Sequence, residues 1–390
     1  MEPGDISKAH SLKPKAISAF MPFVDRKLRQ YLLHYSHCFE QGGLNAMMKA
    51  GFFRHHGGLE VLEYGDLAEP VAGPDEVLVR VRAAALNHLD LFVREGLPGL
   101  NLPMPHIGGC DIAGEIAAIG EGVTGWREGQ RVVVNPNIWC GACEYCIAGE
   151  ETLCDRYGVI GEHQTGGLAQ YIAVPARNLY AIPADYAFEQ AAAVPLVWMT
   201  AWRALIGQAQ LRAGQSVLIL GAGGGVASAA IQIARYAGAT VYAASRSPEK
   251  LARAQELGAD YVVRSDGDWG RELWKQTNKR GVDVVLENVG AATWESSLRS
   301  VAKGGTVVTY GATTGPIVNI DIRKLFWRQF NLIGSTMANN REFNTIMRLV
   351  FWERRFQPLI DKVFPLSEIQ AAQRYLESAE QFGKVVITIP

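Results

Sequence analysis

The chain has 390 residues, and its 38 Lys and Arg side chains nearly balance its 39 Asp and Glu side chains. This balance gives no indication of a nucleic-acid or membrane-surface partner. A hydrophobic content of 48% with 41 glycines is typical of an α/β enzyme with two or three domains. No apolar run is long enough for a transmembrane helix, and a secretory signal pattern is lacking, so we expect a cytoplasmic protein.

The first 46 residues differ in character from the rest, with scattered basic and acidic residues and with Pro14 and Pro22 interrupting their start. We expect an extension outside the catalytic fold, or translation that begins at Met47 or Met48. A targeting or docking segment is the alternative. Its acidic residues and the absence of a cleavage pattern argue against targeting.

From Met48 the pattern changes to short strands and turns. Residues 76–83 alternate apolar and charged side chains, as a half-buried strand does. Further strands are predicted at 114–120, 130–135 and 168–174. We therefore expect a β-rich domain with long loops that ends near Pro183.

From Leu211 strands, glycine turns and helices follow one another repeatedly. The predicted helix 227–236 lies between the first two of six apolar strands, at 216–221, 240–245, 260–263, 282–290, 305–311 and 331–336. This rhythm favours a doubly wound parallel sheet of the Rossmann type. The chain then returns to the first domain, with a last strand at 384–389. The expected division is 1–46 extension, 47–185 with 336–390 catalytic domain, and 186–335 nucleotide-binding domain.

The sequence GAGGGV (221–226) follows a predicted strand and precedes a predicted helix. Glycine is needed at such a turn so that a pyrophosphate can approach the positive N-terminus of the helix. Gly221 and Gly223 match the start of G-x-G-x-x-G, whereas Ala222, Gly225 and Ala227 fit A-x-x-G-x-[GA] better. A plain structural turn is the alternative. The cofactor-binding candidates here are Gly221, Ala222, Gly223, Gly224, Gly225 and Val226, with Gly311 after a later strand.

The second strand of this sheet ends at Ser245-Arg246-Ser247, without the carboxylate that holds the ribose 2′-hydroxyl of NAD. Ser245 and Arg246 can bind a 2′-phosphate, and Lys250 follows one helical turn later. We therefore predict NADP(H) as the cofactor, with NAD as the less favoured choice. The alternative is that Arg246 and Lys250 are ordinary solvated surface residues.

Four cysteines, Cys140, Cys143, Cys146 and Cys154, fall within fifteen residues with the spacing C-x2-C-x2-C-x7-C. Four thiolates this close can form a closed tetrahedral site for one structural zinc ion, with no open position for a substrate. The expected zinc lobe spans 138–156. An iron–sulfur site or plain reduced thiols are the alternatives.

From about Met48 to its end, the chain resembles the medium-chain dehydrogenase/reductase superfamily, which holds zinc alcohol dehydrogenases and quinone or enone reductases. The resemblance rests on AAALNHLDLFVREG, GGCDIAGEIAAIGEGVTGWREGQRVV, the four-cysteine lobe, GGLAQYIAVPARN and the glycine turn. It implies a GroES-like catalytic domain interrupted by a Rossmann domain, with the active site in the cleft between them. It also implies homodimers or homotetramers, often joined through Rossmann sheet edges.

The departures from the zinc alcohol dehydrogenases concern the catalytic metal. Asn87 stands at the position that matches their first Cys ligand, and Cys110-Asp111 match their His-Glu pair. The segment 191–202, which matches the region of their third ligand, contains no Cys, His, Asp or Glu. Asn87 and the PLVWMTAW segment resemble zinc-independent quinone and enone reductases instead.

We therefore predict hydride transfer from NADPH to an activated carbon–carbon double bond or a quinone, without catalytic zinc. Asn87 is the first candidate, as a donor to the substrate oxygen or a positioner of the nicotinamide. His88 and Asp90 are candidates for a proton relay, and Thr200 for a contact with the nicotinamide ribose or the reacting oxygen. Alternatively, Asp90 caps a helix and His88 is a satisfied buried group. An apolar carbonyl substrate would suit a pocket with these aromatic and apolar residues: Phe92, Trp139, Trp198, Met199 and Trp202.

Two other functions remain open from the sequence. A rearranged site in which Cys110, Asp111 and His88 hold a zinc ion would give an alcohol dehydrogenase, with His163 as a further possible ligand. A non-catalytic NADPH-binding protein is the other alternative, since a fold alone does not imply turnover.

Overall fold

The computed structural model describes residues 46–390, so the predicted N-terminal extension lies outside the described residues except for its last residue. The described chain begins with a three-stranded antiparallel sheet in the order β2-β1-β4. Its strands are β1 (Met47–Phe53), β2 (Glu63–Ala68) and β4 (His106–Ile107). The sequence analysis did not predict this sheet. Its central strand is nevertheless largely buried, because one face packs against the C-terminal part of the chain.

A seven-stranded sheet forms the main body of the catalytic domain, in the order β10-β6-β5-β3-β18-β17, with β9 paired to β3. The long strand β3 (Glu76–Leu86) pairs antiparallel with β5 (Asp111–Ile119) on one side and β18 (Lys384–Thr388) on the other. The other strands are β6 (Arg131–Val134), β9 (Tyr171–Pro175), β10 (Leu179–Ala181) and β17 (Ile360–Pro365). The last part of the chain thus returns to the seven-stranded sheet of the catalytic domain, as the sequence analysis expects.

Short elements surround this sheet. A two-stranded sheet of β7 (Asn137–Ile138) and β8 (Gly158–Val159) brackets the four-cysteine loop, which carries α4 (Glu144–Ile147) and η4 (Glu151–Leu153). The remaining elements of this domain are η3 (Leu59–Val61), α3 (His88–Glu95), η5 (Ala176–Asn178), α5 (Phe188–Ala192), α12 (Asn340–Met347), η7 (Arg348–Trp352), η8 (Leu366–Glu368) and α13 (Ile369–Glu377).

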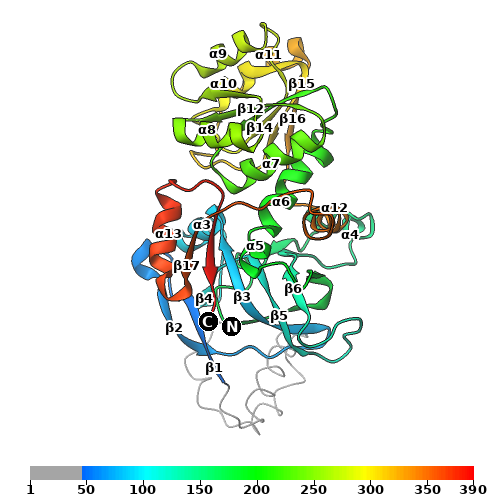
Figure 1. The fold of residues 1–390 in the computed structure, drawn as a ribbon, viewed down its shortest axis with the longest axis vertical. Coiled ribbons are helices and arrows are strands. Elements are labelled where there is room, and N and C mark those ends of the chain that lie inside the picture. Colours follow the sequence, from blue (N-terminus) through cyan, green and yellow to red (C-terminus); the bar gives the residue numbers. More distant parts are fainter. Residues whose placement is uncertain (1–45) are drawn as a thin grey trace, which may run out of the picture. The chain divides into compact units, whose positions relative to one another are not determined.

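The second sheet has six parallel strands in the order β13-β12-β11-β14-β15-β16, which is the doubly wound order of a Rossmann domain (Figure 1). Its strands are β11 (Ser216–Leu220), β12 (Thr240–Ser245), β13 (Tyr261–Arg264), β14 (Val282–Glu287), β15 (Val301–Thr309) and β16 (Asn331–Gly334). The helices are α7 (Gly225–Tyr236), α8 (Pro248–Leu257), α9 (Trp269–Gln276), α10 (Trp294–Ser300) and α11 (Ile322–Arg328). The predicted fold class is therefore confirmed.

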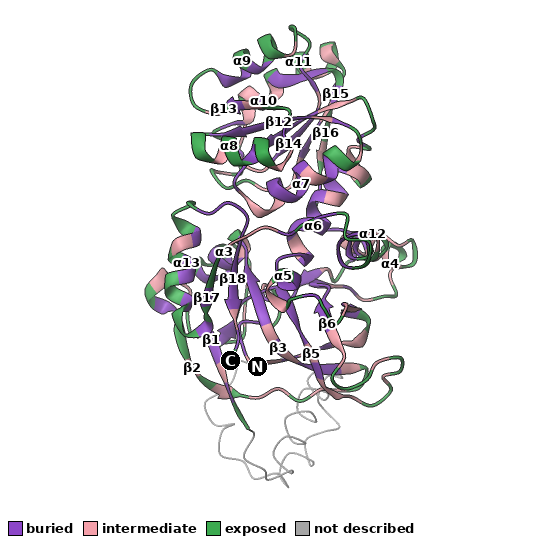
Figure 2. Cartoon of the chain, viewed as in Figure 1, coloured by how far each residue is buried: buried purple, intermediate pink, exposed green. Residues whose placement is uncertain are grey.

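Helix α6 (Pro195–Trp202) and the π-helix η6 (Arg203–Gln208) lead from the catalytic domain into the first Rossmann strand. Proline at the first helical position of α6 begins the helix without losing a hydrogen bond. Nearly all of α6 is buried, because it packs between the catalytic sheet and α7 (Figures 1 and 2). One apolar core therefore runs through both domains.

Several predicted boundaries shift by a few residues. The strand predicted from residue 114 begins at Asp111, and the helix predicted from residue 227 begins at Gly225, directly after the glycine turn. The strand predicted at 168–174 covers Tyr171–Pro175. Among residues 46–390, no helix is both long and apolar enough to cross a membrane.

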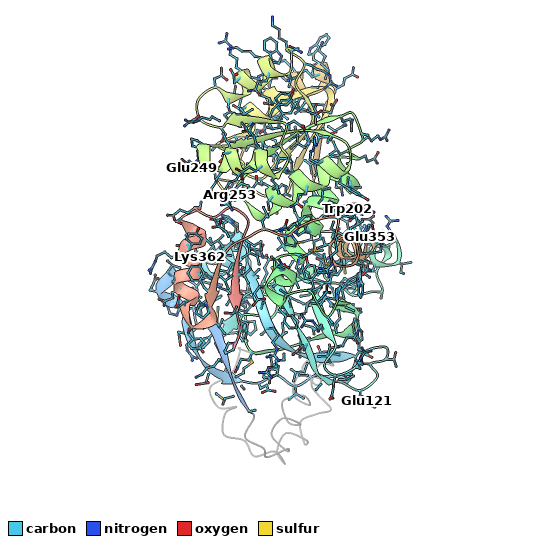
Figure 3. The ribbon with its side chains drawn as sticks, in the orientation of Figure 1. Glu121, Trp202, Glu249, Arg253, Glu353 and Lys362 are labelled. Atoms are coloured by element: carbon cyan, nitrogen blue, oxygen red, sulfur yellow. The ribbon has the colours of Figure 1, made fainter. Side chains whose placement is uncertain are left out.

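The two domains contact each other at the start of β18 and along α8. The backbone N–H of Gly383 donates to the carbonyl of Gly223 in the glycine turn, at 3.0 Å. Arg253 of α8 pairs with Asp361 of β17 at 3.0 Å, and Figure 3 shows Arg253 beside the catalytic domain strand that carries Lys362. The C-terminal strands are therefore joined directly to the predicted cofactor turn.

Candidate active site and metal centre

A cleft of about 800 Å³ is lined by residues from both domains. Most of the predicted site residues line it together: Asn87, His88, Thr200, Gly221, Gly223, Gly224, Gly225, Val226, Ser245, Arg246, Lys250 and Gly311. Two predicted residues do not. Ala222 is fully buried behind the turn, and Asp90 is buried beneath the cleft.

The glycine turn is shaped by close approach of two lysine side chains. A Cβ atom on Gly223 would lie 2.4 Å from Cδ of Lys250, and one on Gly225 would lie 2.9 Å from Cδ of Lys384. Gly221 has a φ of +64°, which favours glycine. Helix α7 begins at Gly225, so its free N–H groups and positive dipole end face the cleft. The turn can therefore hold a pyrophosphate.

Three buried polar atoms along the cleft have no hydrogen-bond partner among the described residues. They are the Asn288 Oδ1, the Tyr310 hydroxyl and the Gln381 Oε1. Leaving such groups unpaired costs about 1–3 kcal/mol each, so they indicate a polar ligand that binds here. The donors and acceptors fit a nicotinamide dinucleotide that extends from the glycine turn.

The end of β12 carries the residues predicted to select the dinucleotide. Ser245 Oγ accepts a hydrogen bond from the N–H of Ser247 at 3.2 Å, and the exposed Arg246 has no ion-pair partner among the described residues. Lys250 Nζ donates to the carbonyl of Ala379 in the other domain. Burial lowers the pKa of Lys250 from its ordinary value. Glu249 lies one residue before Lys250, but its carboxylate accepts from Ser247 Oγ at 2.6 Å.

A buried ammonium group is the main feature that the sequence analysis missed. Lys384 Nζ donates to Asn87 Oδ1 at 2.6 Å, to Asp111 Oδ2 at 2.8 Å and to the Leu86 carbonyl at 2.8 Å. All three of its protons are used, and its side chain is only 4% exposed. We call these residues, Asn87, Asp111 and Lys384, the ammonium centre. It lies where the two sequence positions that match zinc ligands, Asn87 and Cys110, come together.

The amide of Asn87 is committed to protein partners. Its Nδ2 donates to Asp111 Oδ2 at 2.9 Å and lies 3.4 Å from Cys110 Sγ, while its Oδ1 accepts from Lys384. The other carboxylate oxygen of Asp111 accepts from the Leu196 N–H at 2.7 Å. Asn87 lines the cleft, but these contacts favour a positioning role over direct donation to a substrate oxygen.

Asp90 adopts the helix-capping role that the sequence analysis gave as an alternative. Its carboxylate accepts from the N–H of Asn87 at 2.7 Å and from the N–H of Gly109 at 2.9 Å. Burial raises its pKa to about 6, against the opposing effect of these N–H groups and Lys384. Its geometry holds α3 against the loop before Cys110. A proton relay through Asp90 does not fit, because the carboxylate faces the backbone and not the cleft.

His88 and Thr200 both line the cleft. Desolvation within the cleft, followed by the charges of Lys384 and Lys250, lowers the pKa of His88, so the ring favours the neutral form. The Thr200 hydroxyl is 3.8 Å from the Met337 sulfur, a weak hydrogen bond that a better acceptor could replace. Of the five aromatic and apolar residues proposed for a substrate pocket, Phe92 alone lines the cleft; Trp139, Trp198, Met199 and Trp202 do not.

The four cysteines of the loop come together as predicted. Their Sγ atoms lie within 4.8 Å of one another, and no disulfide joins them. Cys140 Sγ accepts from the N–H groups of Ala142 and Cys143, which lower the pKa of Cys140 to about 6. Such N–H contacts stabilise a thiolate, the form that binds a metal. Among the described residues, this is the only group of three or more His, Cys, Asp or Glu side chains close enough to share an ion.

The cysteine lobe is joined to the rest of the domain by Arg203. This buried side chain pairs with Glu150 of the lobe and with Glu342 of α12, each at 2.8 Å. Glu342 in turn caps α12, because its carboxylate accepts from the N–H of Asn339 at 3.0 Å. No comparable metal group is formed by the alternative ligands Cys110, Asp111 and His88. Lys384 is ion-paired with Asp111, and burial raises the pKa of Cys110 well above its ordinary value.

Residues 73–184 match the alcohol dehydrogenase GroES-like domain, and residues 225–352 match the zinc-binding dehydrogenase family. A zinc-type alcohol dehydrogenase-like protein of Schizosaccharomyces pombe is 33% identical over 81% of this chain and 91% of its own length. An acryloyl-coenzyme A reductase of Metallosphaera sedula is 31% identical over 86% of this chain and 97% of its own length.

A solved structure described as an NAD-dependent alcohol dehydrogenase superposes with a TM-score of 0.85 at 42% identity, covering 88% of this chain and 100% of that one. These similarities extend through both domains. The chain therefore belongs to the medium-chain dehydrogenase/reductase superfamily and is an oxidoreductase.

Proposed function

We propose that this protein is an NADP(H)-dependent reductase of activated carbon–carbon double bonds or quinones that works without a catalytic zinc ion. The observation that carries the proposal is the ammonium centre. Lys384 binds Asn87 and Asp111 through buried hydrogen bonds, where Asn87 and Cys110, the two positions that match metal ligands of the zinc-dependent enzymes, come together. A metal ion there would have to displace a positive charge that is already hydrogen-bonded on all three protons.

A nicotinamide dinucleotide bound along the cleft supplies the hydride. The residues of this chain then have to stabilise negative charge that develops on the substrate oxygen. Lys384 lines the cleft, where its ammonium group and the Asp111 carboxylate form a fixed ion pair. A preorganised dipole in a partly dry cleft stabilises an enolate without reorganisation when its positive end faces the substrate oxygen. Asn87 and Asp111 position the ammonium group.

The choice of NADP(H) rests on Arg246 and Lys250. Arg246 is exposed at the cleft without an ion-pair partner among the described residues, and Lys250 lies one helical turn later. No carboxylate occupies the end of β12, where NAD enzymes hold the ribose 2′-hydroxyl. We expect Arg246→Ala to weaken NADPH binding by about 10- to 100-fold, which corresponds to about 1.5–3 kcal/mol for a charged hydrogen bond.

The acryloyl-coenzyme A reductase among the relatives supports reduction of a conjugated double bond. A zinc-dependent alcohol dehydrogenase is the second candidate, favoured by the 42% identical structure described as an NAD-dependent alcohol dehydrogenase. For that function a metal would need the rearranged ligands Cys110, Asp111 and His88. The proposed reductase would hold one zinc ion per chain, bound by the four cysteines.

The two functions separate in one experiment on the purified full-length protein. NADPH oxidation is measured with enones, quinones and enoyl thioesters, and NADP⁺ or NAD⁺ reduction is measured with alcohols. Metal content per chain is measured on the same sample. Double-bond or quinone reduction with one zinc supports the proposal, whereas alcohol oxidation with two zinc ions overturns it. Arg299→Ala, an exposed arginine of α10, is the control for the Arg246→Ala binding measurement.

We also propose that the protein forms a homodimer through the Rossmann sheet edge. Strand β16 is the outer strand of that sheet, and exposed apolar side chains accompany it: Ile317, Ile322, Phe326, Trp327 and Leu332. Trp327 is 76% exposed, which is unusual for a tryptophan of a monomer. Trp327→Glu should convert the dimer to a monomer in sedimentation analysis, and an unchanged sedimentation coefficient would contradict this interface.

A further inference from the structure

The turn that follows β8 brings two titratable residues into the cleft. Glu162 and His163 both line it, together with Asn87, Thr200 and the glycine turn. Gly161 has a φ of +82°, and a Cβ atom there would lie 2.7 Å from the backbone of Gly109. The turn therefore lies against the residue that precedes Cys110 and Asp111. Glu162 thus lines the same cleft as Asn87 and Lys384 of the ammonium centre.

Glu162 differs from the other polar groups of the cleft in having an uncommitted carboxyl group. Its side chain is 17% exposed, and it accepts no hydrogen bond from the described residues. Its one ion-pair contact among the described residues is with His163 Nδ1, at 3.7 Å. Burial raises the pKa of Glu162 from its ordinary value, against the opposing effect of His163. Its protonated form therefore persists closer to neutral pH than that of an exposed glutamate.

His163 is held in one tautomer by the backbone. Its Nδ1 lies 3.2 Å from the N–H of Val159. Because an amide N–H can only donate, Nδ1 must carry the lone pair, and the neutral ring has its proton on Nε2. Protonation of Nδ1 would break this hydrogen bond. The arrangement favours a neutral ring beside a protonated carboxyl group.

Other groups that line the cleft are poorer proton sources. Lys384 uses all three protons, and the Tyr157 hydroxyl donates to Asn137 Oδ1 at 2.8 Å. Burial raises the pKa of Tyr157, and it does so for Tyr310 on the nucleotide-binding domain too. The lowered pKa of His88 leaves its ring without an acidic proton near neutral pH. Glu162 alone among these groups combines acidity with a proton that no protein acceptor holds.

We propose that Glu162 donates the proton that completes the reduction, and that His163 is a positioning residue for it. This inference rests on the proposed function. When the substrate β-carbon accepts a hydride, the electron pair of the carbon–carbon double bond moves toward the carbonyl oxygen and forms an enolate. The O–H bond of Glu162 then breaks as a C–H bond forms at the α-carbon. The remaining Glu162 carboxylate regains a proton from water in the cleft.

The charged and titratable groups around Glu162 limit what else could explain a pH effect. His163 lies on the same turn, and Tyr157 immediately precedes β8. Arg203 of η6 acts on Tyr157, but its charge is paired with Glu150 and Glu342. Across the contact with Gly109, Asp111 is paired with Lys384. Glu162 is therefore the group to which the experiment has to assign the pH effect.

The test compares Glu162→Gln with Glu121→Gln, an exposed glutamate that Figure 3 shows at the far end of the catalytic domain. Glu162→Gln should lower kcat for double-bond reduction by about 10²- to 10⁴-fold, the usual loss for a general acid. NADPH affinity should stay unchanged. Glu162→Asp should recover part of the rate, and Glu121→Gln should have none of these effects.

The pH profile distinguishes an acid from a structural residue. A general acid must be protonated, so the wild-type rate should fall as pH rises through the Glu162 pKa, and this limb should vanish in Glu162→Gln. Since the His163 ring is neutral, His163→Ala should leave the limb in place but lower kcat without changing NADPH affinity, because the Glu162 carboxyl group loses the ring beside it. An unchanged kcat of His163→Ala would overturn the positioning role.

A second readout does not depend on turnover. Infrared difference spectra of the wild type should show a carboxylic acid band that titrates above the ordinary range of glutamate and is absent from Glu162→Gln. A band that titrates in the ordinary range would overturn the inference. Full activity of Glu162→Gln would overturn it while leaving the proposed function in place. Absence of any double-bond reduction by the wild type would overturn both.

Discussion

The four-cysteine lobe and the ammonium centre are the two positions in this chain that match zinc sites of the zinc-dependent dehydrogenases, and they differ in how they are built. The lobe takes its four sulfur atoms from fifteen consecutive residues on one loop. The ammonium centre takes Asn87 from the end of β3, Asp111 from the start of β5 and Lys384 from the start of β18. One region keeps the chemistry of a metal site. The other pairs a buried lysine with a buried aspartate.

This difference shows how a buried charge determines which ion a site accepts. Four thiolates with N–H donors around them attract a soft divalent cation. Asp111 has no exposed surface, and Lys384 neutralises it directly. Removing one partner of such a pair leaves an uncompensated charge, which costs far more than the pair contributes. Substitutions in each region should therefore have effects of different kinds.

The largest expected effect is at the lobe. Cys143→Ser should reduce bound zinc from about one ion per chain to none, and the lobe should lose the stability that metal binding gives, up to about 10 kcal/mol in small zinc domains. Elemental mass spectrometry measures the bound zinc per chain, and thermal unfolding measures the loss of stability. Cys110→Ala is the matched control, because Cys110 is a buried cysteine outside the group of four. Loss of zinc from Cys110→Ala would contradict the separation of the two regions.

At the ammonium centre, Lys384→Met should lower the free energy of unfolding by about 3–5 kcal/mol, because it leaves Asp111 buried without its counter-charge. Adding Asp111→Leu should recover part of that loss, since the double variant has no buried charge. Urea denaturation of the two single variants and the double variant measures the coupling. Additive losses would mean that the two side chains do not form a stabilising pair. Zinc content should stay the same in all three.

The smallest effect concerns thiol reactivity. Burial, together with Asp111 and Asp90, raises the pKa of Cys110, so its thiol should not react with a disulfide reagent in the folded protein. In a Cys38→Ser background, chelation of zinc should release four reactive thiols and denaturation should release one more. The stability cost of Cys110→Ala itself should be about 1 kcal/mol, the scale of a small core deletion. Reaction of five thiols after chelation but before denaturation would show that Cys110 is accessible.

Much of the architecture could be predicted from local patterns. The apolar strands bounded by glycine correspond to β11 to β16, and the alternating residues 76–83 lie within β3. The β1–β2–β4 sheet and β17 were not predicted. β17 has two adjacent charged residues, Asp361 and Lys362, that interrupt any alternation, and it pairs in parallel with β18. Such strands have no distinctive pattern, because their pairing partner decides their structure.

By itself, the sequence determined the four-cysteine group, the glycine turn and the absence of a carboxylate after β12, because each depends on residues close together in the chain. Tertiary structure decided the roles of Asn87, Asp90, Glu162 and Lys384. Asn87 and Asp90 appeared in the sequence as possible catalytic groups. Sheet register supplies the lysine that binds Asn87, whereas Asp90 caps its own helix and accepts from the N–H of Gly109. Lys384 follows Asn87 by 297 positions, and antiparallel pairing of β3 with β18 brings them together. A buried polar group must find partners wherever the fold provides them, so its role is set by residues distant in sequence.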